Sequence, residues 1–407
     1  MKKTVCCLLL FLAALLPFAA SASHTVMIAS DLHYCAPSLY EGSDLFMRSI
    51  AQGDGKMVHK SDVLLDALVR QAEQLHPDIL LLTGDLTFNG EALSHRELAQ
   101  HLDGLADQGI AVYVIPGNHD INCRAARVFQ ENTFTETDTV TPDEFRTIYQ
   151  RFLGKITQDQ IGISYTVSPF PDLVICMLDC AFYEPDAYTF GLLDTAREAW
   201  FQNALDQTDT DTSFVLSATH HSVIPHSSLG KDNFVILNAE RIAKALRAHH
   251  AQLHLSGHLH IQHIAEENGL YDIASGAFSV FPHRYGLLTI EDPHTFSYQA
   301  LPLDDALLPP GFMHESEQWF RNTTGVKTEP TLEALGLSHE EMETMLRYAE
   351  DLNLAYFSGT LSSGDAPWKE QEGYRLWMQY ADQLPFGRYL DIILSEASTN
   401  ALSLRIP

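Results

Sequence analysis

The sequence predicts an α/β protein whose sheets are covered by helices, followed by a small all-α domain. Three observations favour this class. Short apolar runs alternate with helical patterns from residue 25 to about residue 260. The apolar runs are nearly continuous, as in DILLLT over 78–83, which is typical of strands buried on both faces. After a Pro-rich stretch over 301–311, the rest of the chain has helical periodicity only.

The expected elements alternate in the order that is typical of a parallel sheet. Strands are expected at 25–30, 78–83, 110–115, 172–178, 213–219, 251–256, 270–274, 286–290 and 296–301. Helices are expected at 61–75, 93–108 and 238–248, with a further helical pattern near 142–152 inside a long excursion over 120–171. Because the last three strands follow one another closely, the sheet is expected to end in an antiparallel part.

The C-terminal part is expected to form a separate helical domain. Ser338 and Glu341 have the spacing of a capping box before a helix over 342–354. Two more helices are expected over 368–384 and 386–395. The predicted boundaries are therefore 23–305 for the α/β domain and 306–407 for the helical domain.

The first 22 residues have the pattern of a cleavable signal peptide. Lys2 and Lys3 precede an apolar run over 5–18, and Ala20-Ser21-Ala22 is a small-residue cleavage site. The run is shorter than the roughly 20 residues of a comfortable membrane span, and an uncleaved anchor is the alternative. We therefore expect a secreted or cell-envelope protein with no transmembrane span in the mature chain.

The charge balance excludes one class of partner. The 407 residues contain 53 Asp and Glu against 25 Lys and Arg, a net charge of −28. Loss of Lys2 and Lys3 with the signal peptide would leave 23 minus 53, or −30. Non-specific binding of double-stranded nucleic acid needs a basic surface, so no such partner is expected. An anionic substrate would need local cations, which bound metal ions supply.

Polar side chains of the kind that bind metal ions follow five of the expected strands. In chain order they are Asp31-Leu-His33, Gly84-Asp85, Gly117-Asn118-His119-Asp120, His220-His221 and Gly257-His258-Leu-His260. In open α/β sheets, ligands bind at the carboxyl edge of the strands. Carboxylate, imidazole and amide oxygen suit Mn, Fe and Zn. Each piece alone is weak, and Gly-Asp also occurs at Gly53-Asp54. Recurrence at successive strand ends is what indicates a metal centre.

The cysteines beyond the signal peptide do not indicate a disulfide scaffold. Cys176 and Cys180 would lie about 13 Å apart in an extended strand, too far to pair. Cys35 and Cys123 each follow a candidate metal loop, so a bridge between them stays open. Buried free thiols are the default for all four.

The motifs together resemble those of the calcineurin-like metallophosphoesterases, whose pattern is D-x-H, G-D, G-N-H-D, H and G-H-x-H. The resemblance covers about residues 25–290. It implies a four-layer α/β/β/α sandwich and two metal ions bridged by one aspartate. DLHYCAPSLY, GDLTFNGEALSH and LSGHLHIQHI look like a bacterial extracytoplasmic branch with a C-terminal helical domain. Members of that branch have been linked to hydrolysis of cyclic-nucleotide phosphodiesters.

The resemblance implies a ligand set for each metal. Asp31, His33 and His260 would hold the first metal, and Asp85 would bridge both. Asn118, His220 and His258 would complete the second. The same ligand set accommodates Mn, Fe or Zn, so the identity of the two ions stays open.

Four further residues are candidates for supporting or substrate-facing roles. His119 would face the substrate as a general acid. His220 is favoured over His221 as the ligand because it ends an apolar strand, and His221 would then support it. Asp120 is expected to support its loop, and Tyr34 is a substrate candidate.

The implied reaction is hydrolysis of a small phosphate ester. A hydroxide that bridges the metals would attack phosphorus in line, and His119 would protonate the leaving oxygen. Basic residues are scarce near the motifs, which favours a diester monoanion over a monoester dianion. A phosphomonoesterase or nucleotidase, and a catalytically silent metal-binding envelope protein, remain the alternatives. Substrate choice is expected to lie in residues 34–48, in 120–171 and in the helical domain.

Overall fold

The structure is a computed structural model that describes residues 23–154, 162–183, 186–229, 231–362, 368–397 and 400–407. The expected signal peptide, residues 1–22, lies outside the described residues. Among the helices of the described ranges, none combines the length and the apolar character that a membrane crossing requires.

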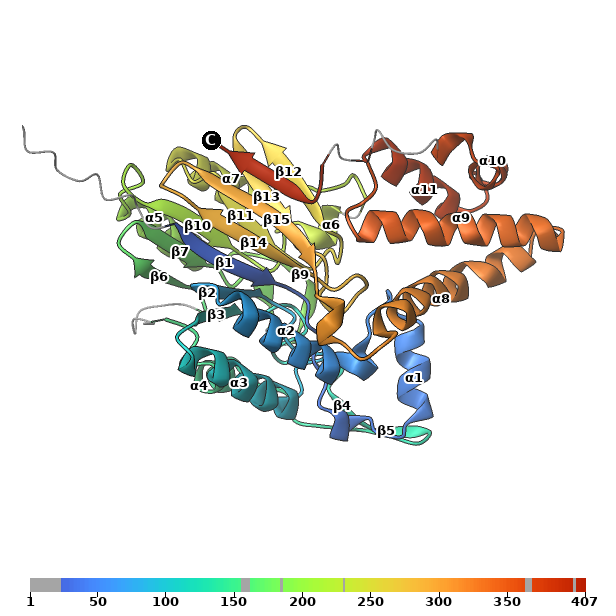
Figure 1. Cartoon of the computed structure of the whole chain (residues 1–407), viewed down its shortest axis with the longest axis horizontal. Coiled ribbons are helices and arrows are strands. Elements are labelled where there is room, and N and C mark those ends of the chain that lie inside the picture. The colour runs from blue at the N-terminus through green and yellow to red at the C-terminus, as the bar shows by residue number, and fades with distance from the viewer. Residues whose placement is uncertain (1–22, 155–161, 184–185, 230, 363–367, 398–399) are drawn as a thin grey trace, which may run out of the picture.

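Two large sheets pack face to face, as Figure 1 shows. In strand order, the described part of the first sheet contains β16 (Ser403–Ile406), β15 (Phe296–Pro302), β14 (Arg284–Ile290), β1 (His24–Ala29), β2 (Ile79–Thr83) and β3 (Ala111–Ile115). The described part of the second contains β12 (His263–Glu267), β13 (Leu270–Ala274), β11 (Leu253–Ser256), β10 (Phe214–Ala218), β7 (Leu173–Met177) and β6 (Tyr165–Phe170).

The first sheet is parallel at one end and antiparallel at the other, and the second has a parallel centre between two antiparallel edge strands. In the first sheet β1, β2 and β3 run parallel, with Met27 opposite Leu80, whereas β14 and β15 run antiparallel. In the second sheet β7, β10, β11 and β13 run parallel, and β6 and β12 are antiparallel edges. Parallel strands bring their carboxyl ends to one edge, and the metal-binding motifs follow these strands.

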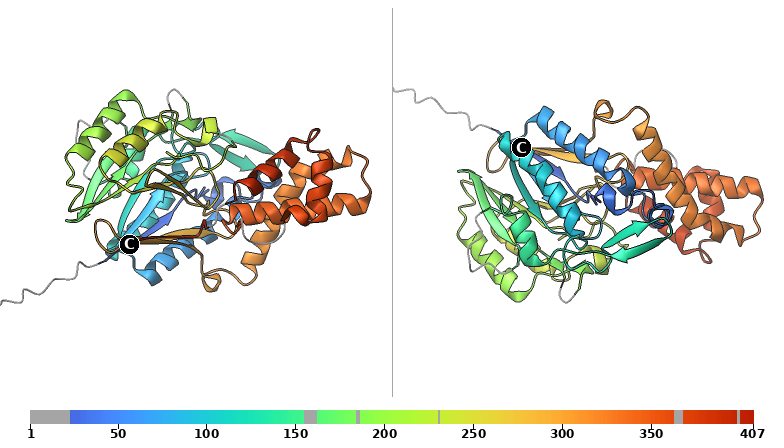
Figure 2. Two further views of the ribbon diagram at one scale, coloured as in Figure 1. Left: turned by 90° about the horizontal axis from the view of Figure 1, so that it is seen from above. Right: turned by 90° about the horizontal axis from the view of Figure 1, so that it is seen from below.

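Helices cover the outer face of each sheet, which makes four layers. α2 (Ser61–Leu75) and α3 (Ala92–Asp107) lie against the first sheet, and α5 (Thr195–Asp206) and α7 (Ala239–Ala248) against the second (Figure 2). The remaining elements of this part are α1 (Asp44–Ala51), β4 (Arg127–Gln130), β5 (Thr133–Glu136), α4 (Pro142–Ile148), β8 (Ala181–Phe182), β9 (Tyr188–Gly191) and α6 (Lys231–Phe234). The predicted α/β/β/α sandwich is confirmed.

The core lies between the two sheets. Phe214 of β10 and Phe296 of β15 meet edge to face across it, with ring centroids 5.4 Å apart. The apolar runs at Ile79–Thr83 and Phe214–Ala218 are buried at every position. Burial on both faces explains why these strands contain no alternating polar residues.

The C-terminal helices lie at one end of the sandwich, beside the carboxyl ends of the central strands (Figure 1). They are α8 (Phe312–Glu333), α9 (His339–Phe357), α10 (Glu372–Gln379) and α11 (Pro385–Ser395). The capping box of Ser338 and Glu341 is present at the start of α9.

The chain differs from the sequence-based expectation at its end. β16 returns to the first sheet and pairs antiparallel with β15, with Ile406 opposite Phe296. The prediction of a purely helical segment over 306–407 is therefore wrong for the last residues. The edge of a sheet offers unpaired backbone groups, and four residues suffice to use them, too few for a recognisable pattern. The open disulfide question is also answered, because Cys35 and Cys123 are free and buried.

Candidate metal centre

Five parallel strands deliver the predicted residues to one edge of the sandwich. β1 ends just before Asp31 and His33, and β2 just before Asp85. β3, β10 and β11 lead in the same way to Asn118, to His220, and to the pair His258 and His260. The topology therefore brings together residues that are up to 229 positions apart in the sequence (260 minus 31).

Five of these residues have an unusual backbone conformation. The φ angles are 54° at Asp31, 45° at His33, 47° at Asp85, 65° at His258 and 59° at His260. Residues with side chains rarely adopt the left-handed region, and such positions cluster at functional sites. The backbone thus turns sharply after β1, β2 and β11, at the residues of the candidate site.

The glycines of the motifs allow a close approach of neighbouring loops. A Cβ atom at Gly117 would lie 2.2 Å from Asp85 Oδ1, and one at Gly84 would lie 2.5 Å from His220 Nδ1. Any larger residue would displace these side chains. The motif glycines are therefore required by packing around Asp85.

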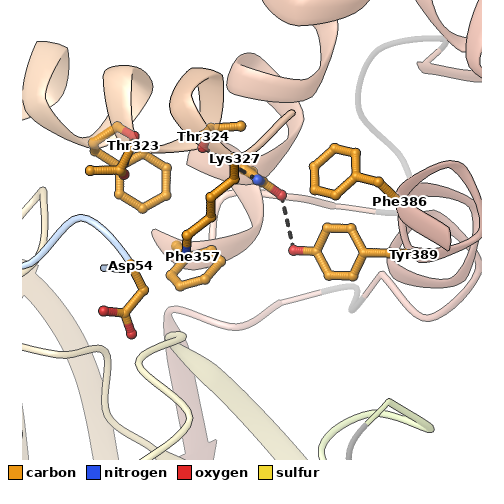
Figure 3. A pocket seen from close by; sticks show the side chains of 9 residues that line it. Asp54, Thr323, Thr324, Lys327, Phe357, Phe386 and Tyr389 are labelled. Atoms are coloured by element: carbon orange, nitrogen blue, oxygen red, sulfur yellow. Dashed lines mark hydrogen bonds between the residues drawn. The ribbon is translucent and has the colours of Figure 1, made fainter. Parts of the chain in front are cut away.

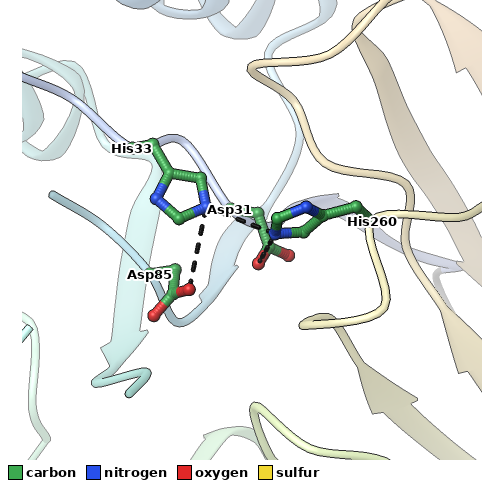
Figure 4. A group of neighbouring side chains, drawn as sticks. All are labelled: Asp31, His33, Asp85 and His260. Atoms are coloured by element: carbon green, nitrogen blue, oxygen red, sulfur yellow. Dashed lines mark hydrogen bonds and ion pairs between the residues drawn. The ribbon is translucent and has the colours of Figure 1, made fainter. Parts of the chain in front are cut away.

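The first group of possible ligands is formed by Asp31, His33, Asp85 and His260 (Figure 4). Their ligand atoms all lie within 4.8 Å of one another, and all four residues are buried. His33 Nε2 lies 3.3 Å from His260 Nε2 and 3.7 Å from Asp85 Oδ2. His260 Nε2 lies 3.3 Å from Asp31 Oδ1. Imidazole nitrogens and carboxylate oxygens thus converge on one small space.

The second group is formed by Asp85, His220 and His258, so Asp85 belongs to both groups. His220 Nε2 lies 3.4 Å from Asp85 Oδ1 and 3.2 Å from Asn118 Oδ1. His220 Nδ1 donates to Thr83 O, and His258 Nε2 donates to Asn233 O. A neutral imidazole that donates from one nitrogen keeps a lone pair on the other, which is the form that binds a metal ion.

The electrostatics of the cluster show two kinds of histidine. Burial lowers the pKa of His33 and of His258 well below the usual range, so both are neutral. Burial also lowers the pKa values of His220 and His260, but adjacent carboxylates raise both pKa values by more. Asp85 raises the pKa of His220 to about 9, and Asp54 with Asp31 raises the pKa of His260 to about 10.

The donor set fits metal ions by its chemistry. Buried carboxylates without a cation draw protons onto His220 and His260, and metal ions replace such protons when they bind. His33 Nδ1 is buried and has no hydrogen-bond partner among the described residues. No hydrogen bond at this nitrogen therefore orients the His33 ring. Two facing imidazole nitrogens beside two carboxylates suit a shared cation of the Mn, Fe or Zn type.

His119 lies at the edge of the cluster. Its backbone N–H donates to Asp85 Oδ1 over 2.8 Å, and its Nδ1 donates to Phe88 O over 2.9 Å. Its Nε2 is 4.0 Å from Asp85 Oδ2, and the side chain is 31% exposed, whereas Asp85 is almost fully buried. The ring is therefore held by its Nδ1, and its Nε2 lies beside the cluster in a partly exposed side chain.

The three other candidates lie in different surroundings. Asp120 is fully buried and accepts hydrogen bonds from the N–H groups of Leu86, Thr87 and Gly117, so it supports the loop. His221 Nε2 donates to Thr189 O, and its Nδ1 contacts Cys180 Sγ. Neither of its nitrogens is free for a metal ion, and of the two histidines it is His220 that belongs to a group of possible ligands. Tyr34 donates to Glu97 on α3, and this contact holds its hydroxyl on the helix, outside the two ligand groups.

Sequence reasoning missed Asp54, which holds the candidate ligand His260. The Asp54 carboxylate accepts a hydrogen bond from His260 Nδ1, and Lys56 Nζ lies 3.4 Å from its other oxygen. A carboxylate behind a metal-binding histidine fixes the ring and its tautomer. In the sequence Gly53-Asp54 resembles a chance Gly-Asp, and in the structure it follows the helix α1 and not a strand. No signal in the sequence distinguishes it.

The chain matches the family described as "Calcineurin-like phosphoesterase" over residues 24–262, which is more than half of its length. It therefore belongs to the calcineurin-like metallophosphoesterase family, a family of phosphate ester hydrolases. Residues 310–400 match a second family, described as "C-terminal domain of cyclic nucleotide phosphodiesterase".

Individual proteins show the same likeness. A "Probable cyclic nucleotide phosphodiesterase" of Vesicomyosocius okutanii is 26% identical over 48% of this chain and 68% of its own length. A 3′,5′-cyclic-nucleotide phosphodiesterase of Nostoc sp. is 23% identical over 51% of this chain and 66% of its own length, just under two thirds. A dimetal phosphatase from Danio rerio superimposes with a TM-score of 0.50 at 14% identity, covering 69% of this chain and 96% of that protein, and shares the fold.

Proposed function

We propose that this protein hydrolyses a phosphodiester, with a cyclic nucleotide as the substrate class, at a centre of two metal ions. The observation that carries the proposal is that Asp85 belongs to both groups of possible ligands. Asp31, His33, Asp85 and His260 would hold one ion, and Asp85, Asn118, His220 and His258 the other. One carboxylate between two sites is what holds a pair of ions close together.

The ions, when bound, would polarise the phosphoryl oxygens and make a water molecule acidic enough to supply the nucleophile. The protein's own contribution begins with three of the histidines. The second nitrogens of His220, His258 and His260 are held by Thr83 O, Asn233 O and Asp54, respectively. These contacts fix the direction of each lone pair before any ligand arrives. Asp85 also accepts the backbone N–H of His119 and so keeps that loop beside the centre.

His119 is proposed as the proton donor to the leaving oxygen. Because its Nδ1 donates to Phe88 O, only Nε2 can exchange a proton with a bound ester. Nε2 lies 4.0 Å from Asp85 Oδ2, and the side chain is partly exposed. A donor at this place would assist departure of an alkoxide, which is a poor leaving group.

The choice of a diester rests on two kinds of support. The relatives named above are described as cyclic nucleotide phosphodiesterases, and so is the family that matches residues 310–400. Lys56, the lysine beside the cluster, is paired with Asp54 in a chain of net charge −28. A monoester dianion would need more uncommitted cations than a diester monoanion.

The test is hydrolysis of bis-p-nitrophenyl phosphate, p-nitrophenyl phosphate and 3′,5′-cyclic AMP by the purified protein with Mn²⁺ or with EDTA. Turnover that requires Mn²⁺ and is faster on the diesters is expected. Faster turnover of the monoester would favour a phosphomonoesterase or nucleotidase on the same site. A folded sample that binds metal and hydrolyses none of the three would contradict the proposal and favour a silent metal-binding protein.

A further inference from the structure

A cavity of about 210 Å³ lies between the loop that carries Asp54 and the C-terminal helices (Figure 3). Its walls include Phe320 and Lys327 from α8, Asn353 from α9, and Phe386 and Tyr389 from α11. The sandwich contributes Asp54 to the lining. None of these residues is used in the chemistry described above except Asp54, which orients His260.

We propose that this cavity is the binding subsite for the nucleobase of a nucleotide substrate. This inference rests on the proposed function and goes further, because it assigns recognition of the base to the C-terminal helices. It is carried by three observations: the position of the cavity, its aromatic walls, and a chain of polar groups on those walls.

The position of the cavity links it to the metal centre. Asp54 lines the cavity and bonds to Nδ1 of His260, whose Nε2 lies 3.3 Å from Asp31 Oδ1 inside the first ligand group. A single imidazole ring thus separates the cavity wall from the ligand group. A nucleotide joins its base to its phosphate through one sugar. One small molecule can therefore place its base in the cavity and its phosphate at the metal centre.

The aromatic walls suit a flat ring. Phe386 and Tyr389 pack with ring centroids 5.3 Å apart at 34°, and Phe320 and Phe357 with centroids 5.2 Å apart at 61°. Figure 3 shows Phe386 and Tyr389 together on one side of the cavity and Phe357 apart from them. Every nucleobase has a π face that stacks on such side chains.

A chain of polar groups crosses the same wall. Tyr389 Oη donates to Asn353 Oδ1 over 2.9 Å, and Asn353 Nδ2 contacts Thr324 Oγ1 at 3.4 Å. Asn353 keeps a second N–H, and both hydroxyl oxygens keep acceptor lone pairs. Asn353 is only 8% exposed. A purely apolar ligand would leave these buried groups without partners, whereas the edge of a base offers donors and acceptors.

Lys327 adds a positive charge to the cavity. Its side chain is exposed and extends from α8 toward Phe357 and Asp54, as Figure 3 shows. It forms no ion pair within the described part of the chain. In a protein of net charge −28, an uncommitted ammonium group on the cavity wall favours an anionic ligand such as a nucleotide.

The experiment compares variants of the full chain with Mn²⁺ on 3′,5′-cyclic AMP and on methyl p-nitrophenyl phosphate, a diester without a base. Asn353→Leu keeps the volume and removes the polar groups, and Lys327→Gln removes the charge. The expected result is a KM for cyclic AMP about ten-fold higher for Asn353→Leu and about three-fold higher for Lys327→Gln. Both variants keep kcat/KM for the small diester within about two-fold.

Lys244→Gln on α7 is the matched control, because Lys244 is exposed and lies outside the cavity. It should leave both substrates unaffected. Unchanged KM values for cyclic AMP in both cavity variants would overturn the inference. Since Asn353 is buried, thermal unfolding is measured for each variant, and Lys327→Gln at an exposed position tests the cavity if Asn353→Leu does not fold.

A direct binding measurement separates this inference from the proposed function. If the wild-type protein hydrolyses no cyclic nucleotide, the proposed function fails. Calorimetric titration with adenosine, which has no phosphate, then tests the cavity alone. Binding that Asn353→Leu weakens about ten-fold supports the subsite. No binding, or equal binding by both proteins, overturns it.

Discussion

The two groups of possible ligands, the two halves of the proposed metal centre, are supported in different ways. In the half formed by His220 and His258, backbone carbonyls of Thr83 and Asn233 hold the ring nitrogens. In the half formed by Asp31, His33 and His260, the support of His260 is a side chain, Asp54, on the loop after α1. Main-chain support comes with the fold itself. Side-chain support depends on one residue and on whatever holds its loop in place.

The C-terminal helices hold that loop. Trp319 Nε1 on α8 donates to Lys56 O over 3.2 Å. A Cβ atom at Gly55 would lie 2.5 Å from the ring of Phe320, so the glycine allows the loop to lie directly against α8. The helical region therefore contributes to the support of the first half, through Asp54, and the second half depends on the sandwich. The following predictions test this asymmetry.

The largest effect is expected from Asp85→Asn, which removes the carboxylate that both halves share. The amide cannot supply two anionic oxygens to two ions, so the protein should lose both metals together. Turnover should fall by about 10³-fold or more, because the ions supply several kcal/mol of transition-state stabilisation. Metal content by mass spectrometry and kcat on bis-p-nitrophenyl phosphate measure the two losses. Loss of only one metal would contradict the bridging role.

His119→Ala should separate chemistry from metal binding. Its side chain bonds to Phe88 O and belongs to neither ligand group, so metal content should stay unchanged. Turnover of cyclic AMP, which has an alkoxide leaving group, should fall by about 10²- to 10⁴-fold. Turnover of bis-p-nitrophenyl phosphate should fall much less, because its leaving group needs no proton. Equal losses on both substrates would argue against a proton donor at this position.

That these candidate ligands lie together could be predicted from the sequence, because each of them closely follows a strand. The patterns around Asp31, Asp85 and His258 fix both the residue type and its place at the sheet edge. The choice of His220 over His221 followed from the same rule, and the structure places His221 on Thr189 O. Local sequence is informative here because parallel strands deliver their ends to one edge.

Features that depend on long-range contacts could not be predicted in this way. Asp54 follows a helix and reaches His260 across 206 positions, so nothing near it marks its role. β16 is four residues long and is a strand only because β15 leaves an open edge beside it. Tyr34 follows a metal-binding motif, but the partner of its hydroxyl is Glu97 on α3. In each case the partner, and not the local pattern, decides the role.

Asp54→Asn tests the asymmetry between the two halves most directly. The amide oxygen still accepts from His260 Nδ1 but no longer carries charge, so the basicity of the ring falls. The affinity for one of the two metal ions should fall by about 10- to 100-fold, and the affinity for the other should change little. Competition titration with a chelator resolves the two affinities.

Asp382→Asn is the matched control for this variant. Asp382 is fully exposed and pairs with Arg388, away from both ligand groups. Neither metal affinity should change. If Asp54→Asn weakened both affinities equally, or neither, then the first half would not depend on a separate support.

The smallest expected effect is a pH-dependent loss of stability at the contact between the sandwich and the C-terminal helices. His283 Nδ1 donates to Phe278 O, and its Nε2 contacts Ser316 Oγ on α8, each over 2.8 Å. Burial lowers the pKa of His283 from 6.5 to about 4. The neutral form is favoured in the folded state, so its contribution to stability is complete above about pH 6.5 and is lost as the pH falls toward 4.

Between pH 7 and pH 5 this histidine should cost about 2 kcal/mol of unfolding free energy, measured by urea denaturation. Glutamine does not titrate, so the unfolding free energy of His283→Gln should fall less over the same pH interval. At pH 7 the variant should be less stable than the wild type. His294→Gln, in the exposed turn between β14 and β15, should keep the full pH dependence. Ser316 lies on α8, the helix that also holds the Asp54 loop. A fall in pH should therefore weaken the support that Asp54 gives to His260 before it weakens the support of His220 and His258. If the unfolding free energy of His283→Gln depended on pH as strongly as that of the wild type, His283 would not be the cause of the loss of stability in acid.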